Sequence, residues 1–154
     1  MKNTFLLFFV LLMACKEAPQ RVTPQEATGT SLLKTVVDPR EGYSEAVIVE
    51  ANGIKTIYIS GQVGEGPTFE AQFRDALGKL LKTLENSGAS FDDVVKYNTY
   101  VVDYSPDMLP VFRAVRKELL GDTDMPASTL VGVPILGLDS WKVEIEATAV
   151  LPVN

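Results

Sequence analysis

Alternation between apolar and polar side chains from Trp141 to Ala149 limits the fold more than any other part of the chain. The apolar members would point to one side of a strand and the polar members to the other. The apolar set is Trp141, Val143, Ile145, Ala147 and Ala149, and the polar set is Lys142, Glu144, Glu146 and Thr148. We therefore predict a strand from Trp141 to Leu151, in a sheet with one apolar face and one carboxylate-rich face. The second face suits a partly wet interface.

Two segments carry the apolar spacing of an amphipathic helix. The first runs from about Thr68 to Asn86 and ends before Gly88, a common helix stop. Its apolar residues recur on one helical face: Phe69, Phe73, Ala76, Leu77, Leu80 and Leu84. The second runs from Met108 to Leu120. Because each helix has a single apolar stripe, we expect both to cover one face of the sheet.

The remaining strands complete an α+β domain. Ala46–Ala51 and Lys55–Ser60 are rich in β-branched residues and flank Asn52-Gly53, a strong hairpin signal. Two further strands are predicted over Val94–Asp103 and Thr129–Val133. The predicted order is ββαβαββ, with a mixed sheet.

Composition excludes several kinds of chemistry. The 154 residues are 46% hydrophobic, which fits one globular domain. Histidine is absent and Cys15 is the only cysteine, so Ser-His-Asp catalysis, an intrachain disulfide and most transition-metal sites are excluded. We expect no metal and no cofactor. The formal charge of -6 repels phosphate backbones, so nucleic acid is not an expected partner.

The first residues read as an export signal. Lys2 precedes an apolar run from Phe5 to Met13, which as a helix would cover about 14 Å, roughly half of a bilayer core. Leu12-Met13-Ala14-Cys15 resembles a bacterial lipobox, in which cleavage leaves the cysteine acylated. We therefore expect a signal peptide over residues 1–14, lipid on Cys15, a flexible tether over residues 15–33 and a domain over residues 34–154. The protein would be exported and anchored to a bacterial membrane; the alternative is a plain signal peptide with an incidental cysteine.

Four short motifs occur in a telling order. They are Gly42-Tyr43-Ser44, Ser60-Gly61-Gln62-Val63, Pro126-Ala127-Ser128-Thr129-Leu130-Val131-Gly132-Val133 and Val143-Glu144-Ile145-Glu146-Ala147-Thr148-Ala149-Val150. Together they resemble the Rid (YjgF-type) family, whose best-known members deaminate reactive enamines and imines. The resemblance spans about residues 42 to 151. It implies a chorismate-mutase-like fold and a homotrimer with small-molecule clefts between subunits.

The resemblance also assigns candidate site residues. Glu144 matches the glutamate that positions the attacking water and relays protons; otherwise it would, like Glu146, simply solvate the strand face. Ser60 and Gly61 match a cleft-lining segment, although a bulged strand end needs the same glycine. Tyr43 matches a tyrosine that contacts the ligand, and its alternative is peripheral core.

Ser128 departs from the family pattern, as does Leu130. Deaminating relatives carry an arginine in place of Ser128, and this arginine holds the substrate carboxylate by a salt bridge. The hydroxyl of a serine offers only one neutral hydrogen-bond donor. Losing such a charged partner commonly costs about 2 to 5 kcal/mol of binding. Amino-acid-derived imines should therefore bind poorly unless Arg113 or Arg116 takes over, and these two could equally be solvated helix charges.

Two functions remain open from the sequence. One is a hydrolase that adds water to an imine, enamine or related C–N bond, with Glu144 as acid and base and with Ser60, Gly61, Thr129 and Leu130 shaping the cleft. The other is a trimer tethered to the envelope that binds a small metabolite without turning it over. The retained glutamate motivates the first, and Ser128 with the acidic charge motivates the second.

Overall fold

The computed structural model describes residues 31–153. The predicted signal peptide, Cys15 and residues 15–30 of the predicted tether lie outside the described residues. Strand β1 (Leu33–Pro39) begins one residue before the expected start of the domain. No helix within residues 31–153 is long and apolar enough to cross a membrane.

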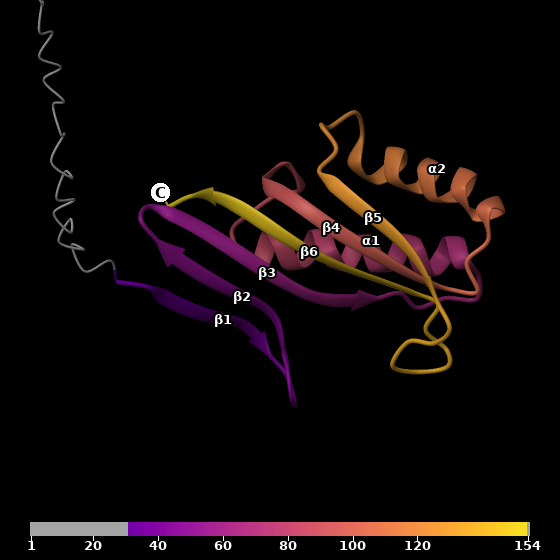
Figure 1. Cartoon of the computed structure of the whole chain (residues 1–154), viewed down its shortest axis with the longest axis horizontal. Coiled ribbons are helices and arrows are strands. Elements are labelled where there is room, and N and C mark those ends of the chain that lie inside the picture. Colours follow the sequence, from indigo (N-terminus) through magenta and orange to yellow (C-terminus); the bar gives the residue numbers. More distant parts are fainter. Residues whose placement is uncertain (1–30, 154) are drawn as a thin grey trace, which may run out of the picture.

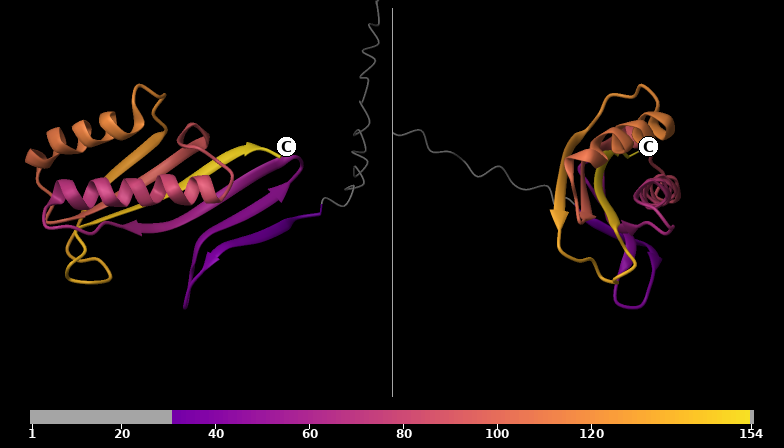
Figure 2. Two further views of the ribbon diagram at one scale, coloured as in Figure 1. Left: turned by 180° about the vertical axis from the view of Figure 1, so that it is seen from behind. Right: turned by 90° about the vertical axis from the view of Figure 1, so that its right-hand side faces the viewer.

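A six-stranded mixed sheet with two helices forms the domain (Figure 1). After β1 come β2 (Ser44–Ala51), β3 (Ile54–Val63), α1 (Phe69–Asn86), β4 (Val94–Val102), α2 (Leu109–Leu120), β5 (Ala127–Val133) and β6 (Val143–Pro152). The order across the sheet is β1-β2-β3-β6-β4-β5, and only β4 and β5 run parallel. Both helices cover the same face (Figure 2). The predicted α+β class is confirmed.

Strand β1 is the element that the sequence analysis missed. It pairs antiparallel with β2 at the edge of the sheet, and only Val37 along it is even partly buried. An edge strand of this kind is held mainly by backbone hydrogen bonds to one neighbour. Because its side chains are exposed, the sequence shows no alternation of apolar and polar residues. The observed order is therefore βββαβαββ.

The helices end as their sequences predict. Thr68 caps α1, because its side chain accepts a hydrogen bond from the amide of Ala71. Gly88 follows this helix with φ +72°, a conformation that glycine adopts without strain. Helix α2 starts one residue later than predicted, because Pro106–Met108 form a 3₁₀ turn before it.

The core lies between the helices and one face of the sheet. The apolar side chains of β6 predicted to share a face are buried there: Val143, Ile145, Ala147 and Ala149. The rings of Phe73 and Phe112 stack with centroids 4.6 Å apart and join the two helices. Their packing leaves the second face of the sheet uncovered, and this face carries Glu144 and Glu146.

Candidate functional site

Glu144 lies on β6 against the backbone of Gly61 in β3. Val63, two residues after Gly61, is the register partner of Glu144, and β3 has an irregular register between Ile59 and Gln62. A Cβ atom added to Gly61 would lie 1.7 Å from Oε1 of Glu144. Gly61 is thus needed for a close approach of the carboxylate to the backbone.

Burial changes the acidity of Glu144. Loss of solvent around the carboxylate raises its pKa above the ordinary value, and the nearby charge of Glu146 raises it further. Within residues 31–153, no side chain donates a hydrogen bond that would counter this effect. The group can therefore hold a proton at higher pH than an exposed glutamate, which suits it to proton transfer.

Glu146 does more than solvate the sheet face. Its Oε1 accepts hydrogen bonds from Asn98 Nδ2 and from the Tyr100 hydroxyl, each 2.8 Å long. The bond to Glu146 raises the pKa of Tyr100, with burial adding to the effect. Two carboxylates on one strand therefore have different surroundings: Glu146 is held by donors and Glu144 is not.

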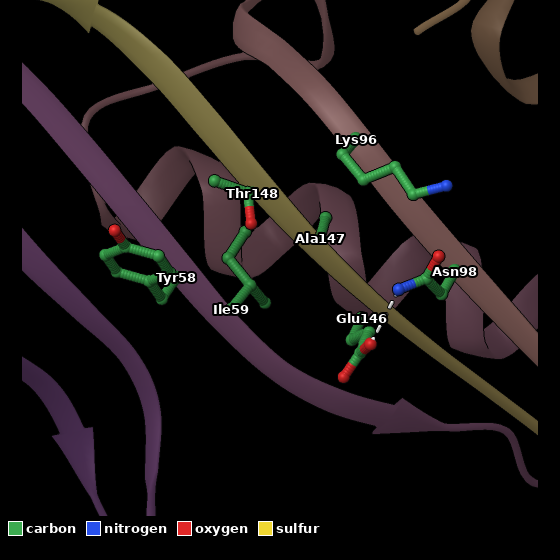
Figure 3. Close-up of a pocket in the computed structure, with 7 residues that line it drawn as sticks. All are labelled: Tyr58, Ile59, Lys96, Asn98, Glu146, Ala147 and Thr148. Carbon is green, nitrogen blue, oxygen red and sulfur yellow. Dashed lines mark hydrogen bonds between the residues drawn. The ribbon is translucent and has the colours of Figure 1, made fainter. Parts of the chain in front are cut away.

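Asn98 and Tyr100 are site residues that the sequence analysis missed. Together with Lys96 they stand at alternate positions of β4, on the same uncovered face as Glu146. Lys96 Nζ donates to Thr129 Oγ1 on the neighbouring strand. A cavity of about 210 Å³ opens on this face (Figure 3), lined by Tyr58, Ile59, Lys96, Asn98, Glu146, Ala147 and Thr148. The polar alternation in β4 was the available signal.

Tyr43 and Gly61 line a second cavity, of about 310 Å³, between the start of β2 and helix α1. Tyr43 is 54% exposed, so it is not a core residue. The Ser60 hydroxyl donates a 2.6 Å hydrogen bond to the carbonyl of Ser44 and joins the two strands at this point. Tyr43, Ser60 and Gly61 therefore lie near one end of β3, and of these three Gly61 is the one that approaches Glu144.

A buried amide fixes this end of β3. Gln62 donates to Glu45 Oε2 at 3.0 Å and accepts a hydrogen bond from Thr83 of α1. Burial works against ionisation of Glu45, yet the bonds from Gln62 and Arg40 keep its pKa below the ordinary value. Glu45 is thus a charged structural partner, in contrast to Glu144.

Ser128, Thr129 and Leu130 lie apart from Glu144 in one copy of the chain. They belong to the edge strand β5, and β4 separates that strand from β6. Ser128 is the register partner of Tyr97, whose hydroxyl accepts a bond from Arg116 of α2. Register partners point to the same side of a sheet, so Ser128 lies on the helix-covered side and Glu144 on the uncovered side.

Arg113 and Arg116 were the candidates to replace the arginine that is missing at position 128. Of these two, Arg116 is the one that contacts Tyr97, the register partner of Ser128. Its Nη1 donates to the Tyr97 hydroxyl at 2.7 Å, and its guanidinium lies 4.7 Å from the centre of the Phe112 ring. Arg113 is exposed on the same helix. In the described part of the chain, no group of three or more His, Cys, Asp or Glu residues could hold a metal ion.

Comparisons with known proteins agree with this architecture. A family model described as endoribonuclease L-PSP matches residues 34–151. A 2-iminobutanoate/2-iminopropanoate deaminase of Dermatophagoides farinae is 30% identical over 139 residues, covering 84% of this chain and 99% of the relative. The deaminase of the same description from Rattus norvegicus is 32% identical over 116 residues, covering 70% of this chain and 79% of the relative.

A solved structure shares both fold and family. It comes from Mycobacterium tuberculosis and is described as a member of the YjgF/YER057c/UK114 family. It is 30% identical with a TM-score of 0.64, and the match covers 77% of this chain and all of the other. The family model, the two relatives and the shared fold show that this chain belongs to the endoribonuclease L-PSP family, also called the YjgF or Rid family.

Proposed function

We propose that this protein is a Rid-type hydrolase that adds water to an imine, enamine or related C–N bond of a small metabolite. The observation that carries the proposal is the carboxylate of Glu144, pressed against Gly61 with a raised pKa. A carboxyl group of this kind can take a proton from an attacking water and give it to the departing nitrogen. The deaminase descriptions of two relatives support turnover over the alternative of binding alone.

The active site is completed between copies of the chain. Ser128 and Leu130 lie on the helix-covered side of their own sheet, whereas Glu144 lies on the uncovered side. This separation supports a site in which β5 of a neighbouring copy supplies Ser128 and Leu130 beside Glu144. The half-buried polar face of β4 and β6 supports a homotrimer with its ligand clefts between subunits.

The substrate of this hydrolase is not anchored by a cation at position 128. Ser128 offers one neutral hydroxyl, so a substrate carboxylate finds no two-pronged ion pair there. We propose that 2-iminopropanoate and 2-iminobutanoate are poor substrates compared with imines or enamines that lack a carboxylate at this point. The acidic charge of the chain, -6, favours neutral or cationic ligands at that cleft.

We also propose that the protein is exported and held at a bacterial membrane through lipid on Cys15. The lipobox-like Leu12-Met13-Ala14-Cys15 supports this. Labelling with a radioactive fatty acid in a bacterial host should mark the wild-type chain and not Cys15→Ala. Equal labelling of both chains would exclude lipid on Cys15.

Ammonia release from freshly generated 2-iminopropanoate and 2-iminobutanoate tests the reaction. Wild type, Ser128→Arg and Glu144→Gln should be compared in one assay, with the oligomeric state measured by light scattering. We expect slow turnover by wild type, faster turnover by Ser128→Arg and none by Glu144→Gln. Fast wild-type turnover would contradict the substrate proposal. Activity in neither wild type nor Ser128→Arg, on these or on uncharged imines, would favour a protein that only binds.

A further inference from the structure

A cavity of about 330 Å³ lies beside the end of helix α2, away from Glu144. It is lined by Arg113, Arg116, Lys117, Gly121, Asp122, Thr123 and Met125. Three cations therefore face one space in a chain whose net charge is negative. Clusters of like charge repel one another, so this arrangement costs stability unless something compensates it.

No carboxylate compensates these cations. Among residues 31–153, Arg113, Arg116 and Lys117 form no ion pair. The other cations in this range without an ion pair do not line this cavity: Lys34, Lys96 and Lys142. Asp122 lines the same cavity without reaching any of the three. With three cations and Asp122, the lining carries a net charge of 3 - 1 = +2.

Arg116 is held in place before any ligand arrives. Its guanidinium stacks on Phe112, and Nη1 donates to the hydroxyl of Tyr97, which is only 2% exposed. Its Nε is buried and has no hydrogen-bond partner within the described residues. A buried, unpaired donor on a charged group is costly, and a fixed guanidinium loses little entropy when it binds an anion.

The loop after α2 is also fixed around the cavity. Gly121, with φ +69°, ends the helix and turns the chain, and its amide bonds the carbonyl of Lys117. The Thr123 hydroxyl donates to Asp92, which ties the loop to the residues before β4. The last carbonyls of α2 carry about half a negative charge, which the three cations outweigh.

We infer that this cavity binds a dianionic oxyanion, such as a phosphate ester or a dicarboxylate of a small metabolite, through Arg116, Arg113 and Lys117. The net charge of +2 in the lining matches a phosphate monoester, which carries about -1.5 to -2 at pH 7. Guanidinium groups suit oxyanions because they donate two parallel hydrogen bonds. The site is separate from Glu144 and does not depend on the proposed hydrolysis.

Calorimetric titration of the full chain tests the inference, in a buffer without oxyanions and with chloride holding the ionic strength constant. The probes are inorganic phosphate, succinate and acetate. We expect saturable binding of phosphate or succinate and much weaker binding of acetate. Tighter binding of phosphate would indicate a phosphate ester as the ligand, and tighter binding of succinate would indicate a dicarboxylate. Acetate binding as tight as either would overturn the dianion assignment.

Variants connect binding to the named residues. Arg113→Gln, which removes an exposed side chain, and Arg116→Gln should each weaken binding about ten- to a hundredfold. Lys34→Gln removes the same unit charge from β1 at the opposite edge of the sheet and should have little effect. Glu144→Gln should bind phosphate normally even if it is inactive. No saturable binding, or equal binding by wild type and Arg113→Gln, would refute the site.

Discussion

Two regions of opposite charge lie on opposite sides of the same sheet, and they are built differently. On the uncovered face, Glu146 is held by Asn98 and Tyr100, while Glu144 lies beside it against Gly61 without a donor. At the end of α2, the cations have no counter-ion, and Arg116 alone is fixed by packing. Within residues 31–153, hydrogen-bond donors satisfy Glu146, whereas Glu144 has no donor and the cations at the end of α2 have no carboxylate partner. Glu144 and these cations are therefore the groups available for a ligand.

The largest expected effect comes from removing the unpaired carboxylate. Glu144→Gln keeps the shape but cannot take up a proton, so turnover should fall about 10²- to 10⁴-fold. Ammonia release measures it, and circular dichroism checks the fold. Asp139→Asn, an exposed change in the loop before β6, should leave the rate near wild type. A fully active Glu144→Gln variant would contradict the functional distinction between Glu144 and Glu146.

Gly61→Ala tests whether turnover and stability depend on the close approach of the Glu144 carboxylate to Gly61. The added methyl would overlap the carboxylate, so turnover and stability should both fall. In a Glu144→Ala background, Gly61→Ala should lower the free energy of unfolding by less, with a coupling free energy of about 0.5 to 3 kcal/mol between the two changes. Urea unfolding of wild type, the two single variants and the double variant gives this number. Additive costs would show that Gly61 is needed for another reason.

Tyr97→Phe tests the fixed arginine on the other side of the sheet. The change removes the acceptor of the Arg116 bond, which should cost about 1 kcal/mol of stability. Phosphate affinity should fall by less than in Arg116→Gln, because the guanidinium remains but is less well held. Calorimetry measures the affinity. Unchanged affinity would show that Tyr97 does not position Arg116 for the anion.

The smallest effect concerns the pH dependence of stability. Because burial raises the pKa of Glu144 in the folded state, its ionisation opposes folding. Wild type should lose stability relative to Glu144→Gln as the pH rises through the folded pKa. The difference in Tm should not change with pH below the ordinary glutamate pKa of 4.5, should grow as the pH rises through the folded pKa, and should then level off. A difference that is constant with pH would contradict the raised pKa.

The two charged regions were predictable to different degrees. Glu144 and Gly61 were both candidates from sequence, and the structure adds that they touch. The donors to Glu146 were missed, although Lys96, Asn98 and Tyr100 alternate along a strand that was predicted. Arg116 was a candidate anion-binding residue, but its position could not be predicted. A charged side chain on a helix has many possible partners until the packing of that helix is known.

By itself, the sequence determined both helices, the strands other than β1, and the two faces of the sheet. Apolar spacing places side chains on one side of a helix or strand regardless of the rest of the chain, and the Asn52-Gly53 turn is local. Only the tertiary structure decided which charged groups meet. Register between β3 and β6 brings Gly61 to Glu144, register between β4 and β6 brings Asn98 to Glu146, and helix packing brings Arg116 to Tyr97. These contacts join residues far apart in the chain, and no local pattern encodes them.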